Sequence, residues 1–211
     1  MIKINKIDKK IEETEGRARI LEGWQLKSVA IVAFIWSLFQ LWYASPLPFI
    51  LGFGVFIDVP ARAIHLGFGL FLAFLSFPFL KKNRHKKIDI FNLSFACIAL
   101  FTTLYLFFNY EGLVYRNGIL LKHPINIFGN TFNFPTELII GAIGILLLLE
   151  ATRRAIGIPL VIVASIFLIY SIFGQSMPEM ISHQGLSLKR LVGYHWFGGE
   201  AIFGTPISVS V

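Results

Sequence analysis

The chain has 211 residues, of which 55% are hydrophobic and 15% are charged, and its net charge is +7. Soluble domains contain roughly 45–50% apolar and 25% charged residues. The apolar residues of this chain lie in long charge-free runs. The sequence therefore indicates an all-α, polytopic membrane protein and not a soluble domain or a β-barrel. The basic residues stand beside these runs, which favours membrane lipid over nucleic acid as their partner.

The first 27 residues are polar and contain many Lys, Glu and Ile residues. No small-residue cleavage pattern follows the first apolar run, so they predict a cytoplasmic segment and not a secretory signal. Trp24 and Lys27 suit the level of the lipid headgroups. The stretch is also compatible with a surface helix that ends near Trp24.

We expect about five membrane spans. They cover residues 28–43, 61–80, 90–110, 136–155 and 159–173. The apolar stretch 49–57 reaches only about 15 Å as a helix, which is too short to cross a bilayer. It therefore predicts an interfacial or re-entrant turn between the first two spans.

The basic residues also predict the orientation of these spans. With the N-terminus in the cytoplasm, the inner segments hold fourteen of the 19 basic residues: Lys3, Lys6, Lys9, Lys10, Arg17, Arg19, Lys27, Lys81, Lys82, Arg84, Lys86, Lys87, Arg153 and Arg154. The outer segments hold Arg62, Arg116, Lys122, Lys189 and Arg190. Because cytoplasmic loops carry the excess of Lys and Arg, this asymmetry predicts a cytoplasmic N-terminus and an external segment after residue 173.

Fusions to alkaline phosphatase test this orientation, because the enzyme is active only when it is exported. A fusion after Lys87 should be inactive, and a fusion near Gly129 should be active. The reverse pattern would contradict the five-span topology.

The outer segments have their own character. Residues 111–135 are rich in Asn, Gly, Phe and Pro, which suggests an ordered loop lying on the membrane. Residues 187–192 are able to form an amphipathic surface helix. Residues 198–206 are rich in small residues and then apolar, and we expect them to open a further membrane element.

A charged corner separates the last two expected spans. Glu150, Arg153 and Arg154 stand between two apolar runs, and one charge at the bilayer centre costs roughly 2.5–3.5 kcal/mol. We therefore place them at the membrane interface, with Glu150 in the favourable orientation for helix ion pairs. As exposed pairs these would contribute about 0.3–0.5 kcal/mol each. On this reading Glu150→Gln is mild, and charge reversal of both arginines is severe.

A second ionisable pair lies at the start of the second span. Arg62 and His65 are three residues apart on one helix face, and ionisable groups inside a membrane suggest a functional site. However, Arg62 can extend its guanidinium to the interface, and His65 can hydrogen-bond a neighbouring helix. We favour a structural or subunit contact over substrate binding.

Catalytic patterns are weak. The five histidines form no H-E-x-x-H pattern or i, i+4 pair, and Cys97 is the only cysteine, so neither a metal centre nor a disulfide is expected. No G-x-S-x-G motif or P-loop is present. The glycine pairs in the second and fourth spans suit close helix packing better than ligand contact. We therefore expect neither an enzyme nor a bound cofactor or metal.

Four sequence markers resemble the fused membrane subunits of tripartite ATP-independent periplasmic (TRAP) transporters. The first is A-R-A-I-H-L-G-F-G-L-F-L-A-F-L at 61–75, and the second is L-L-L-E-A-T-R-R-A-I-G at 147–157. The third is F-L-I-Y-S-I-F-G-Q-S-M-P at 167–178, followed by H-Q-G-L-S-L-K-R-L-V at 183–192. The fourth is G-E-A-I-F-G-T-P-I-S-V-S at 199–210. Their order is that of the family, and the resemblance as a whole covers nearly the whole chain from Trp24 onward.

The resemblance implies a multi-pass protein of a bacterial or archaeal cytoplasmic membrane that takes up organic anions. It implies sodium coupling, a periplasmic substrate-binding protein and a large transport subunit as partners. Residues 28–157 would be the small four-helix part, and residues 158–211 would begin the large subunit. The sodium and substrate sites of the family lie downstream, so none of their residues is carried over to this chain.

Two other classes of function stay open at this point. One is a membrane-bound redox or other enzyme subunit that uses His65 and the loop histidines. The other is a stand-alone membrane adaptor. Absorbance in the haem Soret region would distinguish the redox class from the other two.

Overall fold

The computed structural model describes residues 18–80, 87–116, 119–127 and 130–210. It is all-α, with 73% of its residues in helices. Four helices are long and apolar enough to span a membrane: α2 (Gly23–Ala44), α4 (Asp58–Ser76), α5 (Ile90–Tyr115) and α7 (Ile158–Phe173) with its continuation to Ser176. The expected fold class, a helical multi-pass membrane protein, is confirmed.

The fourth expected span is helix α6 (Thr136–Ala155), and its bounds are those that the sequence predicts. It has 20 residues, about 30 Å of helix and enough to cross the hydrocarbon core. Glu137 lies in its first turn, and Glu150, Arg153 and Arg154 lie near its end. The charged groups of α6 therefore lie near its two ends.

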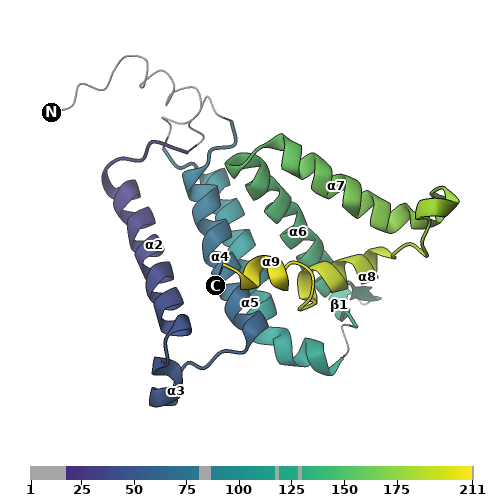
Figure 1. The fold of residues 1–211 in the computed structure, drawn as a ribbon, viewed down its shortest axis with the longest axis horizontal. Coiled ribbons are helices and arrows are strands. Elements are labelled where there is room, and N and C mark those ends of the chain that lie inside the picture. The colour runs from purple at the N-terminus through teal and green to yellow at the C-terminus, as the bar shows by residue number, and fades with distance from the viewer. Residues whose placement is uncertain (1–17, 81–86, 117–118, 128–129, 211) are drawn as a thin grey trace.

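Helices α4, α5 and α6 form the centre of the bundle (Figure 1). The α5 helix begins at the N-cap Asp89, whose side chain accepts a hydrogen bond from the Asn92 backbone N–H at 3.1 Å. Gly67 of α4 faces Thr103 of α5, and a Cβ at position 67 would lie 2.6 Å from the Thr103 hydroxyl. A small residue is therefore needed for the close approach of these two helices, as the sequence suggests.

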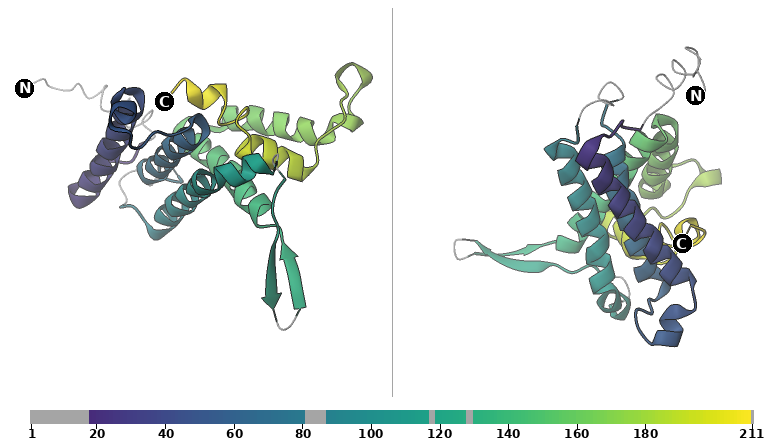
Figure 2. Two further views of the ribbon diagram at one scale, coloured as in Figure 1. Left: turned by 90° about the horizontal axis from the view of Figure 1, so that it is seen from below. Right: turned by 90° about the vertical axis from the view of Figure 1, so that its left-hand side faces the viewer.

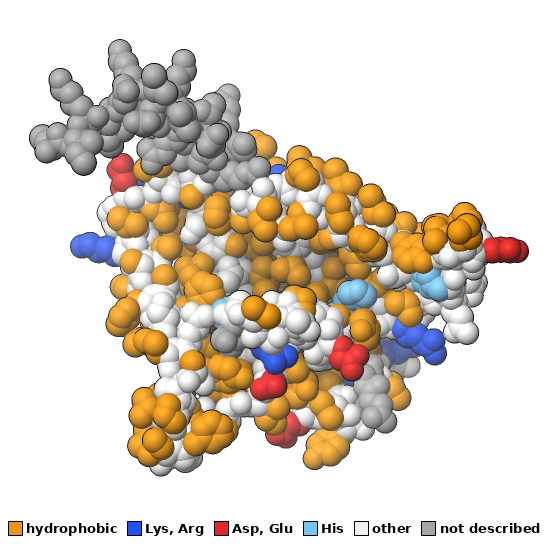
Figure 3. All heavy atoms as spheres, in the orientation of Figure 1, with side chains coloured by type: hydrophobic (Ala, Val, Ile, Leu, Met, Phe, Trp, Pro, Cys, Tyr) orange, Lys and Arg blue, Asp and Glu red, His pale blue; other side chains and the backbone are white. Residues whose placement is uncertain are grey.

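Helices α2 and α7 lie at the outside of the bundle, along α4 and α6 respectively (Figure 1). Only Gln25 is buried in α2, and no residue of α7 is buried. Hydrophobic side chains cover most of the face seen in Figure 3. A helix that is apolar all round and yet exposed in the isolated chain is suited to contact with lipid or with another membrane subunit.

The connection between α2 and α4 contains no helix long enough to span a bilayer. It contains the five-residue helix α3 (Leu47–Leu51), which ends at Gly52 in the left-handed conformation with φ 63°. Phe49 and Phe53 are 74% and 72% exposed. This short apolar segment is therefore placed to lie in the membrane interface.

Residues 111–135 differ from the expected loop on the membrane surface. Helix α5 continues to Tyr115, and an antiparallel β-hairpin follows, with β1 (His123–Ile127) paired to β2 (Asn130–Phe134). Figure 2 shows the hairpin projecting away from the helices. The alternation of apolar and polar residues in I-N-I and T-F-N-F is the period-2 signal of a strand, and the sequence interpretation missed it.

The N-terminal segment differs in one respect. Helix α2 begins at Gly23, so Trp24 lies in the first turn of a membrane span and not at the end of a surface helix. The expected cytoplasmic stretch up to residue 17 lies outside the described residues.

The C-terminal residues fold back over the bundle (Figure 1). They form the short helices η3 (Glu179–Ile181), α8 (Leu188–Val192), η4 (Gly193–Phe197) and α9 (Thr205–Ser208). The expected surface helix is present as α8, but Leu191 and Val192 are buried against the bundle. Phe203 is fully buried, so the segment expected to open a new membrane element instead packs against α4.

Candidate functional site

The charged corner at the end of α6 is a closed ion-pair network. The Glu150 Oε2 atom lies 2.7 Å from Arg153 Nε, and Oε1 lies 2.7 Å from Arg154 Nε. A second bond from Arg153 Nη2 to Oε1, at 2.8 Å, makes the Arg153 contact bidentate. The single carboxylate therefore binds both arginines, as the i+3 and i+4 spacing predicts.

The burial of Arg154 corrects the expectation of exposed pairs. Its side chain is fully buried, and its Nη1 donates to Asn92 Oδ1 of α5 at 2.6 Å. The guanidinium lies 4.8 Å from the ring centroid of Phe74 in α4 and 5.3 Å from that of Phe95 in α5. Burial strengthens these contacts and makes the loss of either charge costly. The corner therefore locks α6 to α4 and α5.

Arg153 and Arg19 also lie at this end of the bundle. Arg153 is partly exposed, stacks over the Phe79 ring at 4.6 Å and donates to the Phe79 carbonyl at 3.3 Å. Arg19 donates to the Lys87 carbonyl at 2.6 Å. Burial lowers the pKa of Arg19 from its usual value, Asp89 opposes this shift and the charge of Arg154 adds to it. This end of the bundle is thus organised around arginines that bind backbone carbonyls and aromatic rings.

His65 and Arg62 both contact elements that are distant in the sequence. His65 Nδ1 lies 3.2 Å from Trp36 Nε1 and 3.2 Å from Gln40 Nε2, so it accepts hydrogen bonds from α2. Its Nε2 lies 3.4 Å from the Ser210 hydroxyl. Three protein groups therefore surround this imidazole, which joins α2 and α4 to the C-terminal segment.

Arg62 has a similar joining role. Its Nη1 donates to the Phe203 carbonyl at 2.8 Å, and its Nη2 pairs with Asp58 one helical turn earlier at 3.4 Å. The Phe203 contact is the reason the guanidinium does not simply extend into solvent. Both residues of the pair thus contact other elements of the chain, and a structural role for them stays a prediction.

The sequence interpretation missed a buried cluster at the other end of α6. Glu137 is fully buried, and its carboxylate accepts two hydrogen bonds from Arg116, at 2.9 and 3.0 Å. It also accepts from the Leu121 backbone N–H at 2.5 Å and from the Tyr105 hydroxyl at 3.1 Å. Hydrogen bonding to Glu137 raises the pKa of Arg116, while burial acts in the opposite direction.

This cluster fixes the chain between α5 and the β-hairpin. Glu137 in the first turn of α6 is a recognisable signal, because an acidic residue is favoured at a helix N-terminus. Its partner Arg116, however, is 21 residues away, and no local pattern connects the two.

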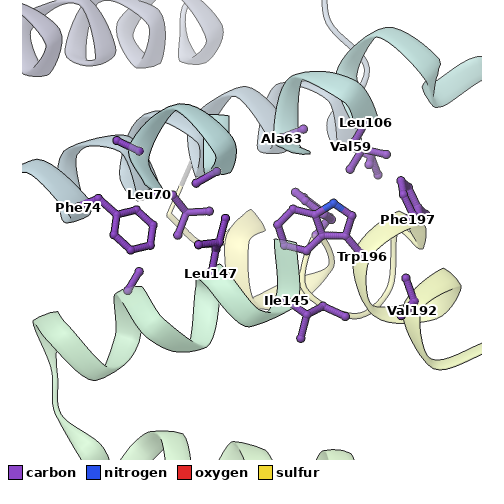
Figure 4. Close-up of a cluster of buried hydrophobic side chains, with 14 of the residues drawn as sticks. Val59, Ala63, Leu70, Phe74, Leu106, Ile145, Leu147, Val192, Trp196 and Phe197 are labelled. Carbon is purple, nitrogen blue, oxygen red and sulfur yellow. The ribbon is translucent and has the colours of Figure 1, made fainter. Parts of the chain in front are cut away.

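The C-terminal segment packs closely against two glycines of α6. A Cβ at Gly141 would lie 2.5 Å from Val192, and a Cβ at Gly144 would lie closer than 3.0 Å to the indole of Trp196. Figure 4 shows Trp196 between α6 and the helices of Val59 and Leu106, with Val192 and Phe197 beside it. The Trp196 side chain is fully buried. The α6 glycines therefore permit close packing, as expected.

Protein groups contact the side chains of His65, His183 and His195. His183 lies 3.1 Å from the Tyr170 carbonyl through Nε2 and accepts from the Gly185 N–H at 3.0 Å, and His195 Nδ1 lies 2.9 Å from the Leu191 carbonyl. His85 lies outside the described residues. Among the residues that the structure describes, no three His, Cys, Asp or Glu side chains form a group that could hold a metal ion.

The structure thus brings each predicted ionisable residue to a junction between elements. Glu150, Arg153 and Arg154 join α6 to its neighbours, and Arg62 and His65 join α4 to the C-terminal segment, but the two groups do not meet in one site. Comparison of the chain with protein-family models, with curated proteins and with solved structures finds no match.

Proposed function

We propose that this chain is the N-terminal scaffold part of a TRAP-type secondary transporter permease for organic anions. In the full transporter, uptake would be driven by sodium, and a periplasmic binding protein would supply the substrate. The location would be the cytoplasmic membrane of a bacterium or archaeon. The role of this part is to hold the moving transport elements in place.

The observation that carries the proposal is the way the four family-like markers pack against one another. Residues 61–75 contact residues 199–210 through Arg62 to the Phe203 carbonyl and His65 to Ser210. The two halves of the third marker also meet. The Leu186 N–H donates to the Ser171 carbonyl at 2.7 Å, and the His183 N–H donates to the Gly174 carbonyl at 3.1 Å.

The second marker also joins separate elements, because it contains the network of Glu150, Arg153 and Arg154 that fixes α6 to α4 and α5. Each marker therefore contains residues that join separate elements of the fold. Such residues suit a rigid frame better than a catalytic centre, and alternating access requires a frame against which other elements move.

The exposed apolar helices support a membrane partner. Phe34 and Leu41 of α2 are 63% and 68% exposed, and Phe167 of α7 is 64% exposed. Lipid covers such faces in a bilayer, and a large transport subunit would cover one of them in the assembled permease. The helix α7, which is apolar on every side, is the better candidate because it belongs to the part that resembles the large subunit.

Uptake by proteoliposomes tests the proposed function. The 211-residue chain alone should give no sodium-dependent accumulation of labelled dicarboxylates or amino acids, because the moving repeats and the ion sites of the family are not among its residues. Accumulation should appear when the chain is reconstituted with a matching large subunit and binding protein under an inward sodium gradient.

Two controls complete the experiment. Vesicles without a sodium gradient, and vesicles that lack only the binding protein, should both stay at background. Sodium-dependent accumulation by the chain alone, or failure of every large subunit of this class to bind it in detergent, would overturn the proposal.

A further inference from the structure

A cavity of about 840 Å³ lies between the end of α5 and the α8–η4 segment. Leu113 and Val114 of α5 form one wall, Ile119 and Leu120 another, and Phe197 of η4 a third. The volume is in the range of small-molecule sites, which are typically apolar clefts with a few polar groups that fix orientation. This cavity contains both kinds of group.

The polar groups of the cavity are cationic. Lys189 and Arg190 of α8 line it, together with Tyr110 and Tyr194, and no Asp or Glu is among the lining residues. Neither the Lys189 nor the Arg190 side chain has an ion-pair or hydrogen-bond partner in the described part of the chain.

The arginines of the other clusters differ in this respect. Arg62, Arg116, Arg153 and Arg154 are each paired with a carboxylate of the chain. The charge of the two cations of α8 is thus neutralised by no carboxylate among the described residues, and both cations lie beside an apolar cavity.

The position of the cavity indicates where its ligand comes from. It adjoins the last turns of α5, a helix long and apolar enough to span a membrane, and the residues that follow that helix. The end of such a helix lies at the boundary between hydrocarbon and headgroups. This holds whichever side of the membrane the cavity faces.

We propose that the cavity binds an anionic phospholipid. The phosphate would lie against Lys189 and Arg190, with the Tyr110 and Tyr194 hydroxyls able to donate to its oxygens, and an acyl chain would cover the apolar walls. Charge complementarity selects the anionic headgroup, and the apolar walls at the membrane boundary select a lipid over a free anion. The inference does not depend on the proposed transport function.

Native mass spectrometry of the purified full chain tests the proposal, with phosphatidylglycerol and phosphatidylcholine of identical acyl chains as probes. The chain should bind phosphatidylglycerol in preference to phosphatidylcholine. The double variant Lys189→Gln/Arg190→Gln should bind phosphatidylglycerol about 30-fold more weakly, since each basic residue near a lipid surface contributes roughly a fivefold factor.

The matched control is Lys27→Gln/Lys122→Gln, which removes the same charge at exposed positions that do not line the cavity. It should bind both lipids as the unmodified chain does. Val114→Trp, which fills the cavity without changing the charge, should weaken binding of both lipids. A Lys189→Arg/Arg190→Lys variant should retain binding, and heat-induced unfolding of every variant shows that the fold is kept.

Three results would overturn the proposal. One is equal phosphatidylglycerol binding by the chain and by the Lys189→Gln/Arg190→Gln variant. Another is an equal loss in the Lys27→Gln/Lys122→Gln control, which would indicate general surface charge. The third is displacement of the lipid by equimolar glycerol phosphate, which would show a site for a soluble anion and no use of the apolar walls.

Discussion

Replacement of Glu150 by alanine should lower the free energy of unfolding by about 3 kcal/mol, at the lower end of the range for breaking a buried ion pair. The change removes the only carboxylate that pairs with Arg154 in the described part of the chain, and the Arg154 side chain is fully buried. The Asn92 side-chain oxygen Oδ1 and the Phe74 and Phe95 rings still contact the guanidinium. These contacts limit the loss of stability. This expectation replaces the mild effect predicted from the sequence.

The midpoint of heat-induced unfolding in detergent measures the effect. For a chain of about this size, 1 kcal/mol corresponds to a shift of roughly 2–4 °C, so Glu150→Ala should lower the midpoint by roughly 6–12 °C. Glu200→Ala removes an exposed carboxylate with no ion pair in the described residues and should stay within about 0.5 kcal/mol. Arg153→Gln, at the partly exposed arm of the network, should cost about 1 kcal/mol or less.

A double variant separates the loss of the pair from the loss of packing. Glu150→Leu with Arg154→Met replaces both charges by apolar groups, and such replacements are often neutral. It should therefore be more stable than Glu150→Ala alone. If Glu150→Ala were as harmless as Glu200→Ala, Arg154 would be solvated in the membrane-embedded protein and the buried network would be wrong.

Gly144→Ala should lower the free energy of unfolding by about 1–3 kcal/mol, the usual range for overpacking a filled core. The added methyl group would lie closer than 3.0 Å to the Trp196 ring, and this ring is fully buried among other side chains. The α8–η4 segment should therefore separate from α6, and protease cleavage between residues 174 and 198 should become faster than in the unmodified chain.

Gly69→Ala is the matched control for this prediction. It also adds one methyl group to a glycine inside a helix, but the nearest atom is Trp36 Cη2 at 4.0 Å. Because alanine is favoured over glycine in helices by about 1 kcal/mol, Gly69→Ala should be neutral or stabilising. In the Gly144→Ala background, Trp196→Leu should cost less than it does alone, because the smaller side chain relieves the clash. Equal stability of Gly144→Ala and Gly69→Ala would contradict the close packing of Trp196 on α6.

The membrane helices were predictable because the bilayer imposes a simple rule on the sequence. A span needs about 20 predominantly apolar residues, and charges must move to its ends. This rule gave the bounds of α6, Thr136–Ala155, because the charge-free run 138–149 is too short to cross and the span must extend at both ends. It also gave the short connection at 49–57, where the apolar run is too brief to cross.

The β-hairpin was missed for a different reason. Its strands have only five residues each, and their alternation is brief beside the strong hydropathy of the neighbouring helices. Asn and Gly, which occur in the same stretch, favour turns and loops. The pairing of β1 with β2 therefore outweighed a composition that is typical of irregular structure.

Some partners of the charged residues could be predicted from the sequence and others could not. Glu150 with Arg153 and Arg154 could be paired from their spacing, because residues three and four apart meet on a helix. Neither the burial of Arg154 nor its bond to Asn92, 62 residues earlier, could be derived in this way. The same holds for Glu137 with Arg116, and for His65 with Ser210, 145 residues away.

The sequence by itself determined which segments form long apolar helices and where their charges lie, since hydropathy and helix periodicity depend on residues that are close together in the chain. Only the tertiary structure decided which glycines admit Trp196 and which carboxylate neutralises which arginine. It also decided that Lys189 and Arg190 lie beside an apolar cavity with no ion-pair partner among the described residues. These features arise from contacts between helices that are far apart in the chain, and the strength of each contact depends on burial, which exists only once the helices have packed.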